Sequence, residues 1–251
     1  MLEIKALSFW YQVTAPPVVY QCTFVVKPRE FVAVVGESGG GKSTILRLSS
    51  GLLQQHLGDV GTLAFLEGAV MFDGRLVSAP LDEFGYVPQN FSAGLYPAGS
   101  ALENVLMAVA EDGISQSERA LAAELLDVSG LSDVAHLNVR QLSGGQQQRV
   151  AICRALVKKP MLLFMDEPFA NLDSSLRPEM GDLLNRIRER DELAILLVTH
   201  DIEGAIKLAN TIVGVRATYG RPMYYTWSVG NKSPSDLQRE IERWISDDSP
   251  Q

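Results

Sequence analysis

The sequence has few of the features that mark secreted, membrane-spanning or metal-binding chains. Its only two cysteines, Cys22 and Cys153, lie far apart and outside any metal-ligand spacing, which argues against a disulfide framework or a cysteine metal site. Both are expected to be reduced and buried. The longest apolar runs are too short to cross a bilayer, and the first residues lack the basic and apolar regions of a signal peptide.

Basic residues are also scarce. The chain carries 22 lysines and arginines against 30 acidic residues, a net charge of −8. This balance argues against a protein that wraps nucleic acid, because such binding needs clustered cations to neutralise phosphates. It leaves nucleotide binding open, since backbone N–H groups can hold phosphates on an acidic protein. The 251 residues, of which 46% are apolar, suffice for a sizeable core.

A glycine-rich stretch follows one of the apolar runs. Residues 31–35 are apolar without alternation, which is typical of a strand buried on both faces. GESGGGKST follows at 36–44, and Ile45, Leu46 and Leu48 then continue with helical spacing. Strand, glycine-rich loop and helix form the context of a P-loop, whose backbone N–H groups and lysine bind phosphates. A chance glycine-rich turn is the alternative, and the flanking elements argue against it. The stretch predicts a nucleoside triphosphate site.

A second glycine-rich turn, LSGGQ at 142–146, opens another segment with helical spacing. Ser143 is suited to cap this helix, and the two glycines leave its N–H groups open to an anion. An ordinary helix cap is the alternative. The pattern predicts that the helix continues up to Pro160, with Lys158 and Lys159 in its last turn.

These motifs together resemble those of the ATP-binding cassette (ABC) ATPases, and the resemblance covers residues from about 2 to 215. MLLFMDE at 161–167 is similar to the Walker B strand, and ANLD at 170–173 to the D-loop. The resemblance implies an α/β fold: a RecA-like P-loop NTPase core with an N-terminal antiparallel β-subdomain and an inserted α-helical subdomain. It implies one ABC ATPase domain over 1–251, with the helical subdomain at about 91–158, between Q-loop and Walker B.

The resemblance also assigns roles to single residues. Glu167, His200 and Lys42 are expected to be catalytic, and Asp166, Ser43 and Gln89 to hold Mg²⁺. ATP is expected to contact the following residues: Tyr11, Gly36, Glu37, Ser38, Gly39, Gly40, Gly41, Lys42, Ser43, Thr44, Gln89, Ser143, Gly144, Gly145, Gln146 and Asp173.

Several of these residues have plainer alternatives. Asp166 and Glu167 could form an acidic helix start before Pro168, although a carboxylate that ends a buried strand is costly unless it binds a metal. His200 could be an ordinary surface histidine, but it follows an apolar strand whose end faces the ligand edge of such folds. The role predicted for Gln89 is based on its spacing in the family alone. Tyr11 is chosen from the aromatic cluster 9–11 for its ability to stack on adenine.

In the family the Ser-Gly-Gly turn completes the site of a facing subunit, so the resemblance implies a head-to-tail dimer that encloses two ATP molecules. Asp173 would couple the two sites. The membrane permease subunits are expected to be separate chains, with a periplasmic or extracellular substrate-binding protein as an indirect partner and no nucleic acid. The expected location is peripheral, at the cytoplasmic face of the cell membrane.

Two segments extend beyond these motifs. Residues 52–69 are longer and more apolar than the usual connection, and they are expected to extend a β-hairpin near Asp73 and Gly74. Gly204 stands where the family usually has an acidic residue. Residues 234–246 have the capping and apolar spacing of an amphipathic helix, with packing on its own domain as the default and a dimer contact as the alternative.

The function that follows is an ATPase subunit powering a membrane ABC transporter. Phe169, in DEPFANLD, favours importers of small ions or organic anions, similar to nitrate, sulfonate and iron cassettes. One alternative is an exporter with separate membrane chains. Another is a soluble ABC ATPase, which usually has long insertions or two cassettes. A kinase or GTPase is a further alternative, but it leaves LSGGQ unexplained and the chain has no NKxD motif.

Overall fold

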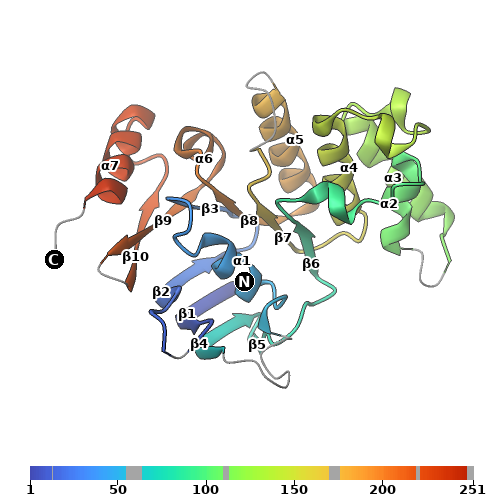
Figure 1. Cartoon of the computed structure of the whole chain (residues 1–251). Coiled ribbons are helices and arrows are strands. Elements are labelled where there is room, and N and C mark those ends of the chain that lie inside the picture. The colour runs from blue at the N-terminus through green and yellow to red at the C-terminus, as the bar shows by residue number, and fades with distance from the viewer. Residues whose placement is uncertain (13, 55–63, 110–112, 170–175, 219–220, 248–251) are drawn as a thin grey trace. The chain divides into compact units, whose positions relative to one another are not determined.

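The computed structural model describes residues 1–251 except 13, 55–63, 110–112, 170–175, 219–220 and 248–251. The chain divides into two compact units (Figure 1). Unit 1 comprises residues 1–81 and 194–251, and unit 2 comprises residues 82–193. Unit 2 contains the whole predicted helical subdomain together with the two strands and the long helix that flank it. Both units combine strands and helices, as the predicted α/β fold class requires.

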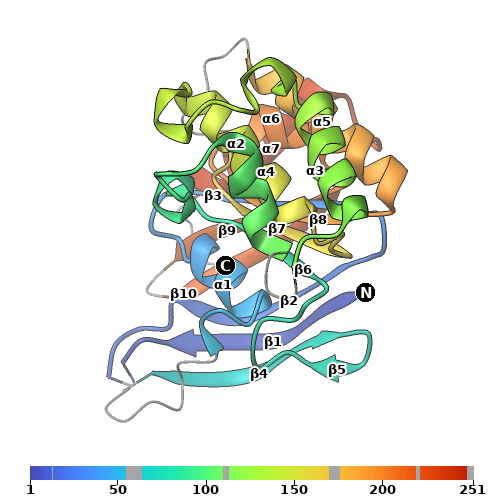
Figure 2. The same cartoon turned by 90° about the vertical axis from the view of Figure 1, so that its right-hand side faces the viewer.

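Unit 1 begins with an antiparallel sheet in the strand order β2-β1-β4-β5 (Figure 2). Its strands are β1 (Leu2–Trp10), β2 (Val19–Val26), β4 (Phe65–Phe72) and β5 (Arg75–Leu76). Asp73 and Gly74 both adopt positive φ, as a tight hairpin turn between β4 and β5 requires. Residues 65–69 of the predicted extension form the start of β4, which pairs with β1, whereas residues 55–63 lie outside the described part.

The second sheet of unit 1 carries the phosphate loop. Its strand order is β10-β9-β3-β8, with β3 (Phe31–Gly36) parallel to both β8 (Ala194–Thr199) and β9 (Thr211–Thr218). Every residue of β3 and β8 is buried, which explains why neither run alternates. The antiparallel edge strand is β10 (Arg221–Ser228). The helices of this unit are α1 (Lys42–Ser49), α6 (Ile202–Leu208) and α7 (Pro234–Ser246).

Unit 2 consists mainly of helices. Two parallel strands, β6 (Phe84–Val87) and β7 (Leu162–Asp166), are accompanied by α2 (Ala101–Leu106), α3 (Gln116–Val128), α4 (Gly144–Leu156) and α5 (Leu176–Asp191). Short 3-10 helices span Phe91–Gly94 (η2), Met107–Val109 (η3), Ser132–Val134 (η4) and Val139–Gln141 (η5). Reciprocal serine–glutamate or serine–glutamine caps begin α2, α3 and α4, so side-chain chemistry sets each start.

The end of α4 differs from the prediction. The helix stops at Leu156, so Lys158 and Lys159 follow it and do not form its last turn. Lys159 has a φ of 53°, a left-handed conformation that turns the chain out of the helix before Pro160 is reached. Among the described residues no helix combines the length and apolar character that a membrane crossing requires.

Candidate functional site

The phosphate loop is shaped by two glycines that tolerate no side chain. A Cβ on Gly36 would lie 2.1 Å from the carbonyl oxygen of Val215, and a Cβ on Gly41 would lie 2.4 Å from that of Val18. Both walls are backbone, so neither can move aside cheaply. Gly39, by contrast, has a φ of 82° and no heavy atom within 4 Å of where a Cβ would be, so the loop is open at this point. The loop therefore has tight ends and an open middle.

Lys42 lies inside this loop. Its side chain is almost fully buried, and the Nζ ammonium donates hydrogen bonds to the carbonyl oxygens of Gly36 (2.9 Å) and Glu37 (2.8 Å). A buried ammonium is tolerated only where such acceptors surround it. Because α1 begins at Lys42 and Gly41 offers no capping side chain, the positive end of the helix dipole faces the loop. The loop thus concentrates positive charge and N–H donors where an anion would bind.

The register of unit 1 brings His200 to the same sheet edge. In the parallel pair β3–β8, Val35 lies opposite Thr199, so the loop and His200 leave neighbouring strands at their carboxyl ends. His200 is exposed. The Thr199 hydroxyl accepts a hydrogen bond from the Asp201 N–H (3.0 Å), and Asp201 caps α6 by accepting from the Gly204 N–H (2.9 Å). These contacts hold the turn on which His200 lies.

The same turn offers a structural reason for the glycine at 204. A Cβ at this position would lie 2.7 Å from the Asp201 carboxylate, so glycine lets the cap approach closely. This contact is local, because Asp201 lies only three residues before Gly204. The backbone walls at Val18 and Val215, by contrast, depend on contacts between distant segments, which no sequence pattern indicates.

Tyr11 is the member of the aromatic cluster that faces solvent near the loop. Its side chain is about half exposed, and its hydroxyl lies 3.3 Å from the Thr44 hydroxyl. Phe9 is fully buried and meets the Tyr11 ring edge-on, with the centroids 4.8 Å apart, while Trp10 packs against Phe65. Of the three aromatics, only Tyr11 therefore combines exposure with a hydrogen bond to the phosphate loop.

Unit 2 assembles a second group of predicted residues at one sheet edge. In the parallel pair β6–β7, Val87 lies opposite Met165, so Gln89 and the acidic pair Asp166–Glu167 both follow the carboxyl ends of neighbouring strands. Asp166 is buried, whereas Gln89 is exposed. Glu167 has a φ of 50°, a left-handed conformation that costs a non-glycine residue about 1 kcal/mol or more. Strained backbone of this kind is concentrated at functional sites.

The Ser-Gly-Gly turn begins α4 as predicted for a capped helix. The Ser143 hydroxyl accepts from the Gln146 N–H (3.3 Å), and the Gln146 side-chain oxygen accepts from the Ser143 N–H (2.9 Å). Ser143 and Gly144 are exposed, and a Cβ on Gly144 would have open space around it. The hydroxyl hydrogen of Ser143 is thus able to donate to an incoming anion. Gly145, by contrast, is buried. Asp173 of the D-loop lies outside the described residues.

The cysteines are structural. Cys22 and Cys153 are both free and buried. Burial raises the pKa of the Cys153 thiol to about 11, and it raises the pKa of Cys22 still further. Thiolate is the reactive form, so neither residue is suited to nucleophilic chemistry.

Comparisons with known proteins agree with these motifs. A family profile described as ABC transporter matches residues 19–170, which is more than half of the chain. The taurine import ATP-binding protein TauB of Pseudomonas entomophila is 35% identical over 222 residues, covering 88% of this chain and 81% of the relative. The nitrate import ATP-binding protein NrtD of Synechococcus elongatus is 37% identical over 229 residues, covering 88% and 76%.

Solved structures show the same fold. CbiO1 from Clostridium perfringens, part of the ABC transporter complex CbiONQ, matches 96% of this chain and 91% of its own with a TM-score of 0.78 at 23% identity. The dimeric bacterial ABC transporter cassette MJ0796 matches 92% of this chain and all of its own, with a TM-score of 0.73 at 30% identity. The motifs, the family profile and the relatives agree, and the chain belongs to the ABC transporter family as an ATP-binding, ATP-hydrolysing subunit.

Proposed function

We propose that this chain hydrolyses ATP to drive the import of a small ion or organic anion through a membrane ABC transporter. The ATP-hydrolysing role follows from the family. The direction and the kind of solute rest on the relatives, which are named for the import of taurine and nitrate. The structural observation that carries the proposal is the phosphate loop, whose end glycines admit no side chain and which encloses Lys42.

The triphosphate would be held by residues 36–44, with Lys42 and the N–H groups of the loop as donors and Tyr11 stacked on the adenine. Ser43, Gln89 and Asp166 would hold Mg²⁺, which when bound neutralises phosphate charge. This donor set fits the ion, because Mg²⁺ is usually bound by one or two carboxylates and the phosphates.

Glu167 would act as the general base. Its carboxylate would accept a proton from the attacking water, and the rigid strand end with buried Asp166 before it supports a fixed position. His200 would contact the γ-phosphate and orient it for attack. Catalysis of this kind depends on positioning and charge stabilisation more than on covalent chemistry by the protein.

We also propose that two copies face each other head to tail. Each copy's Ser143, Gly144, Gly145 and Gln146 would close over the ATP bound by the partner's loop, and Asp173 would couple the two sites. The exposed start of α4 supports this arrangement, since the positive end of the helix and the Ser143 hydroxyl are open to an anion from outside. MJ0796 has been solved as a dimer, and also in a post-hydrolysis state with ADP and phosphate.

A groove in unit 2 supports the proposal that the chain binds membrane subunits. It has a volume of about 420 Å³, and residues of β6, η2, η3 and α4 line it, including Pro88, Phe91, Met107 and Arg154. Pro88, which lines the groove, directly precedes Gln89 in the chain. A segment docked in the groove would therefore be linked to the predicted nucleotide site through the backbone. We propose that permease subunits dock in this groove, which would place the protein at the cytoplasmic face of the membrane. A substrate-binding protein would act through the permease.

Two alternatives remain distinct. An exporter cassette with separate membrane chains would use the same ATP site, and a soluble ABC ATPase would use no permease. The relatives named for import favour the importer over both alternatives.

The test is an uptake assay in cells that lack the gene and receive either the wild-type chain or the Lys42→Ala variant. Uptake of radiolabelled taurine, other sulfonates and nitrate is expected to fall in the deletion strain and to return only with the wild-type chain. Unchanged uptake of all these solutes, or recovery with the variant, would contradict the import proposal. Accumulation of a solute in the deletion strain would instead indicate an exporter.

A further inference from the structure

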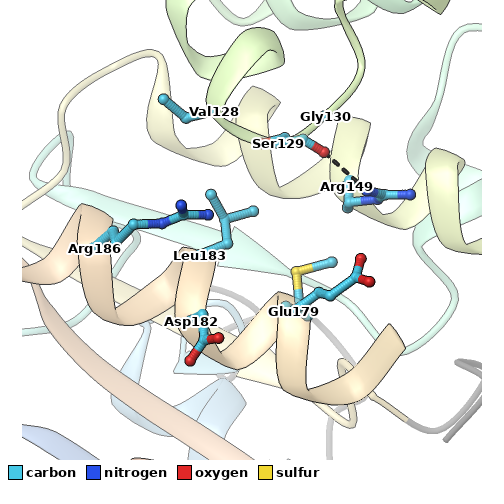
Figure 3. A pocket seen from close by; sticks show the side chains of 9 residues that line it. Val128, Ser129, Gly130, Arg149, Glu179, Asp182, Leu183 and Arg186 are labelled. Carbon is cyan, nitrogen blue, oxygen red and sulfur yellow. Dashed lines mark hydrogen bonds between the residues drawn. The ribbon is translucent and has the colours of Figure 1, made fainter. Parts of the chain in front are cut away.

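A second cavity lies within unit 2, away from all residues of the predicted ATP site. It has a volume of about 250 Å³ and lies between α5, the end of α3 and α4 (Figure 3). Its floor is apolar and buried, formed by Met180 and Leu183 of α5, with buried Ser129 from the end of α3. Drug-sized sites occupy roughly 300–1,000 Å³, so this cavity is of the size that suits a metabolite no larger than an amino acid.

Charges of opposite sign stand at the two ends of this apolar floor. Glu179 and Arg186 are both on α5, seven residues apart, which is two helical turns or roughly 10 Å. They are too far apart to pair with each other. In the described part of the chain neither side chain makes a hydrogen bond or an ion pair, and both are exposed. The cavity therefore offers one anionic end and one cationic end, each open to a ligand.

The orientation of Arg186 is consistent with a side chain that is open to a ligand. Asp182 stands four residues before Arg186, the spacing at which acidic and basic side chains pair on a helix. The pair Glu203–Lys207 on α6 does so. Asp182 and Arg186 do not: in Figure 3 the Arg186 guanidinium extends toward Leu183, and the Asp182 carboxylate points the other way. The remaining charge, Arg149, donates to the Ser129 carbonyl oxygen (2.9 Å) and so has a structural partner.

We propose that this cavity binds a small zwitterion, with a primary ammonium at Glu179, a carboxylate or sulfonate at Arg186, and a short aliphatic chain on Met180 and Leu183. Charge complementarity selects this class. A simple anion would face Glu179, and a simple cation would face Arg186 and Arg149, so each would meet an uncompensated like charge. The bound ligand would link α5 to the α3–α4 segment of unit 2.

The test is calorimetric titration of the nucleotide-free chain with taurine, homotaurine, γ-aminobutyrate and ε-aminocaproate. Butylamine and butyrate serve as singly charged controls. At least one zwitterion is expected to bind about tenfold more tightly than either control. Arg186→Gln and Glu179→Gln are each expected to weaken that binding about tenfold or more, because each removes a charge-assisted contact. Asp182 also lines the cavity, but its carboxylate points away from Arg186 in Figure 3, so Asp182→Asn should change the binding less than about twofold.

Three results would overturn the proposal: no zwitterion of the series binds, the singly charged controls bind as well, or both glutamine variants bind like the wild type. ATP binding by each variant reports that it is folded. None of the residues lining the cavity belongs to the predicted ATP site, so this experiment and the uptake assay can fail independently.

Discussion

At the scale of single residues, the site depends on backbone positions that only particular residues can occupy. Gly36 and Gly41 abut carbonyl oxygens of distant segments, so even alanine would displace backbone atoms. Glu167 shows the opposite situation, since it is a non-glycine residue held at a positive φ. Glycine would suit that backbone better, so a glutamate at this position comes at the expense of local strain.

Glu167→Gln tests this role. Glutamine has nearly the same shape but cannot accept a proton from water, so hydrolysis is expected to fall by about 10²–10⁴-fold while ATP binding changes little. Steady-state phosphate release and equilibrium binding of a fluorescent ATP analogue measure the two properties. The variant should also accumulate as an ATP-dependent dimer in size-exclusion chromatography. Hydrolysis at the wild-type rate would show that Glu167 is not the base.

The cysteines lead to a second prediction at this scale. With a pKa of about 11, only about one Cys153 thiol in a thousand is ionised at pH 8, and the pKa of Cys22 is raised further. Since thiolate is the reactive form, neither cysteine should react with Ellman's reagent in the native chain at this pH. Both should react at once in guanidinium chloride. Rapid labelling of the native protein would contradict the observed burial.

At the scale of elements, α7 shows how an amphipathic helix is attached to its own unit. Its apolar stripe buries Leu237 and Ile241, and the helix packs on α6 and β9. Trp244 meets Trp227 edge-on with the centroids 5.4 Å apart, and Gly214 of β9 leaves room for both rings. These contacts favour the default interpretation, packing on the helix's own domain, over a dimer contact.

A buried arginine fastens the end of this helix. The Arg216 Nη1 group donates to the carbonyl oxygens of Trp244 and Asp247, both at 2.7 Å, and the guanidinium lies over the Trp244 ring. Arg216→Ala should lower the free energy of unfolding by about 2–4 kcal/mol, because packing and two hydrogen bonds are lost together. Denaturant unfolding measures the loss. Arg243→Ala, an exposed change on α7, is the matched control and should cost less than about 0.5 kcal/mol.

At the scale of the whole molecule, the predicted site residues are divided between two units. The phosphate loop, Tyr11 and His200 belong to unit 1, whereas Gln89, Asp166, Glu167 and the start of α4 belong to unit 2. The shared-site proposal requires that the start of α4 acts on the ATP of a second copy. This requirement can be tested by mixing variants.

Ser143→Arg blocks the start of α4, and Lys42→Ala disables the phosphate loop. Each variant alone should lose nearly all turnover, and Ser143→Arg should still bind ATP. In a head-to-tail mixed dimer, the intact loop of one chain meets the intact Ser143 of the other, so one working site forms. The mixture should therefore recover ATPase activity that neither variant has. An inactive mixture, or an active Ser143→Arg monomer, would contradict the shared site.

The motifs and the buried strands could be predicted because each depends on residues that are neighbours in the sequence. Strand, glycine-rich loop and helix at 31–48 predict a phosphate site from neighbouring residues alone, and the serine cap at 143 is equally local. The prediction failed at the end of α4, because the helix ends at Leu156, before the position that Pro160 suggests, and Lys159 is already left-handed.

The sequence by itself thus determined the family and the fold class, and it predicted the residue types of the site. Only the tertiary structure decided which segments meet. Strand register brings His200 and the phosphate loop to the ends of neighbouring strands, and it does the same for Gln89 and Asp166 in unit 2. Packing leaves Tyr11 as the exposed aromatic that is hydrogen-bonded to Thr44. It alone revealed the charged cavity on α5. The physical reason is that helix caps and loop conformations depend on adjacent residues, whereas register, burial and cavities depend on contacts between residues far apart in the chain.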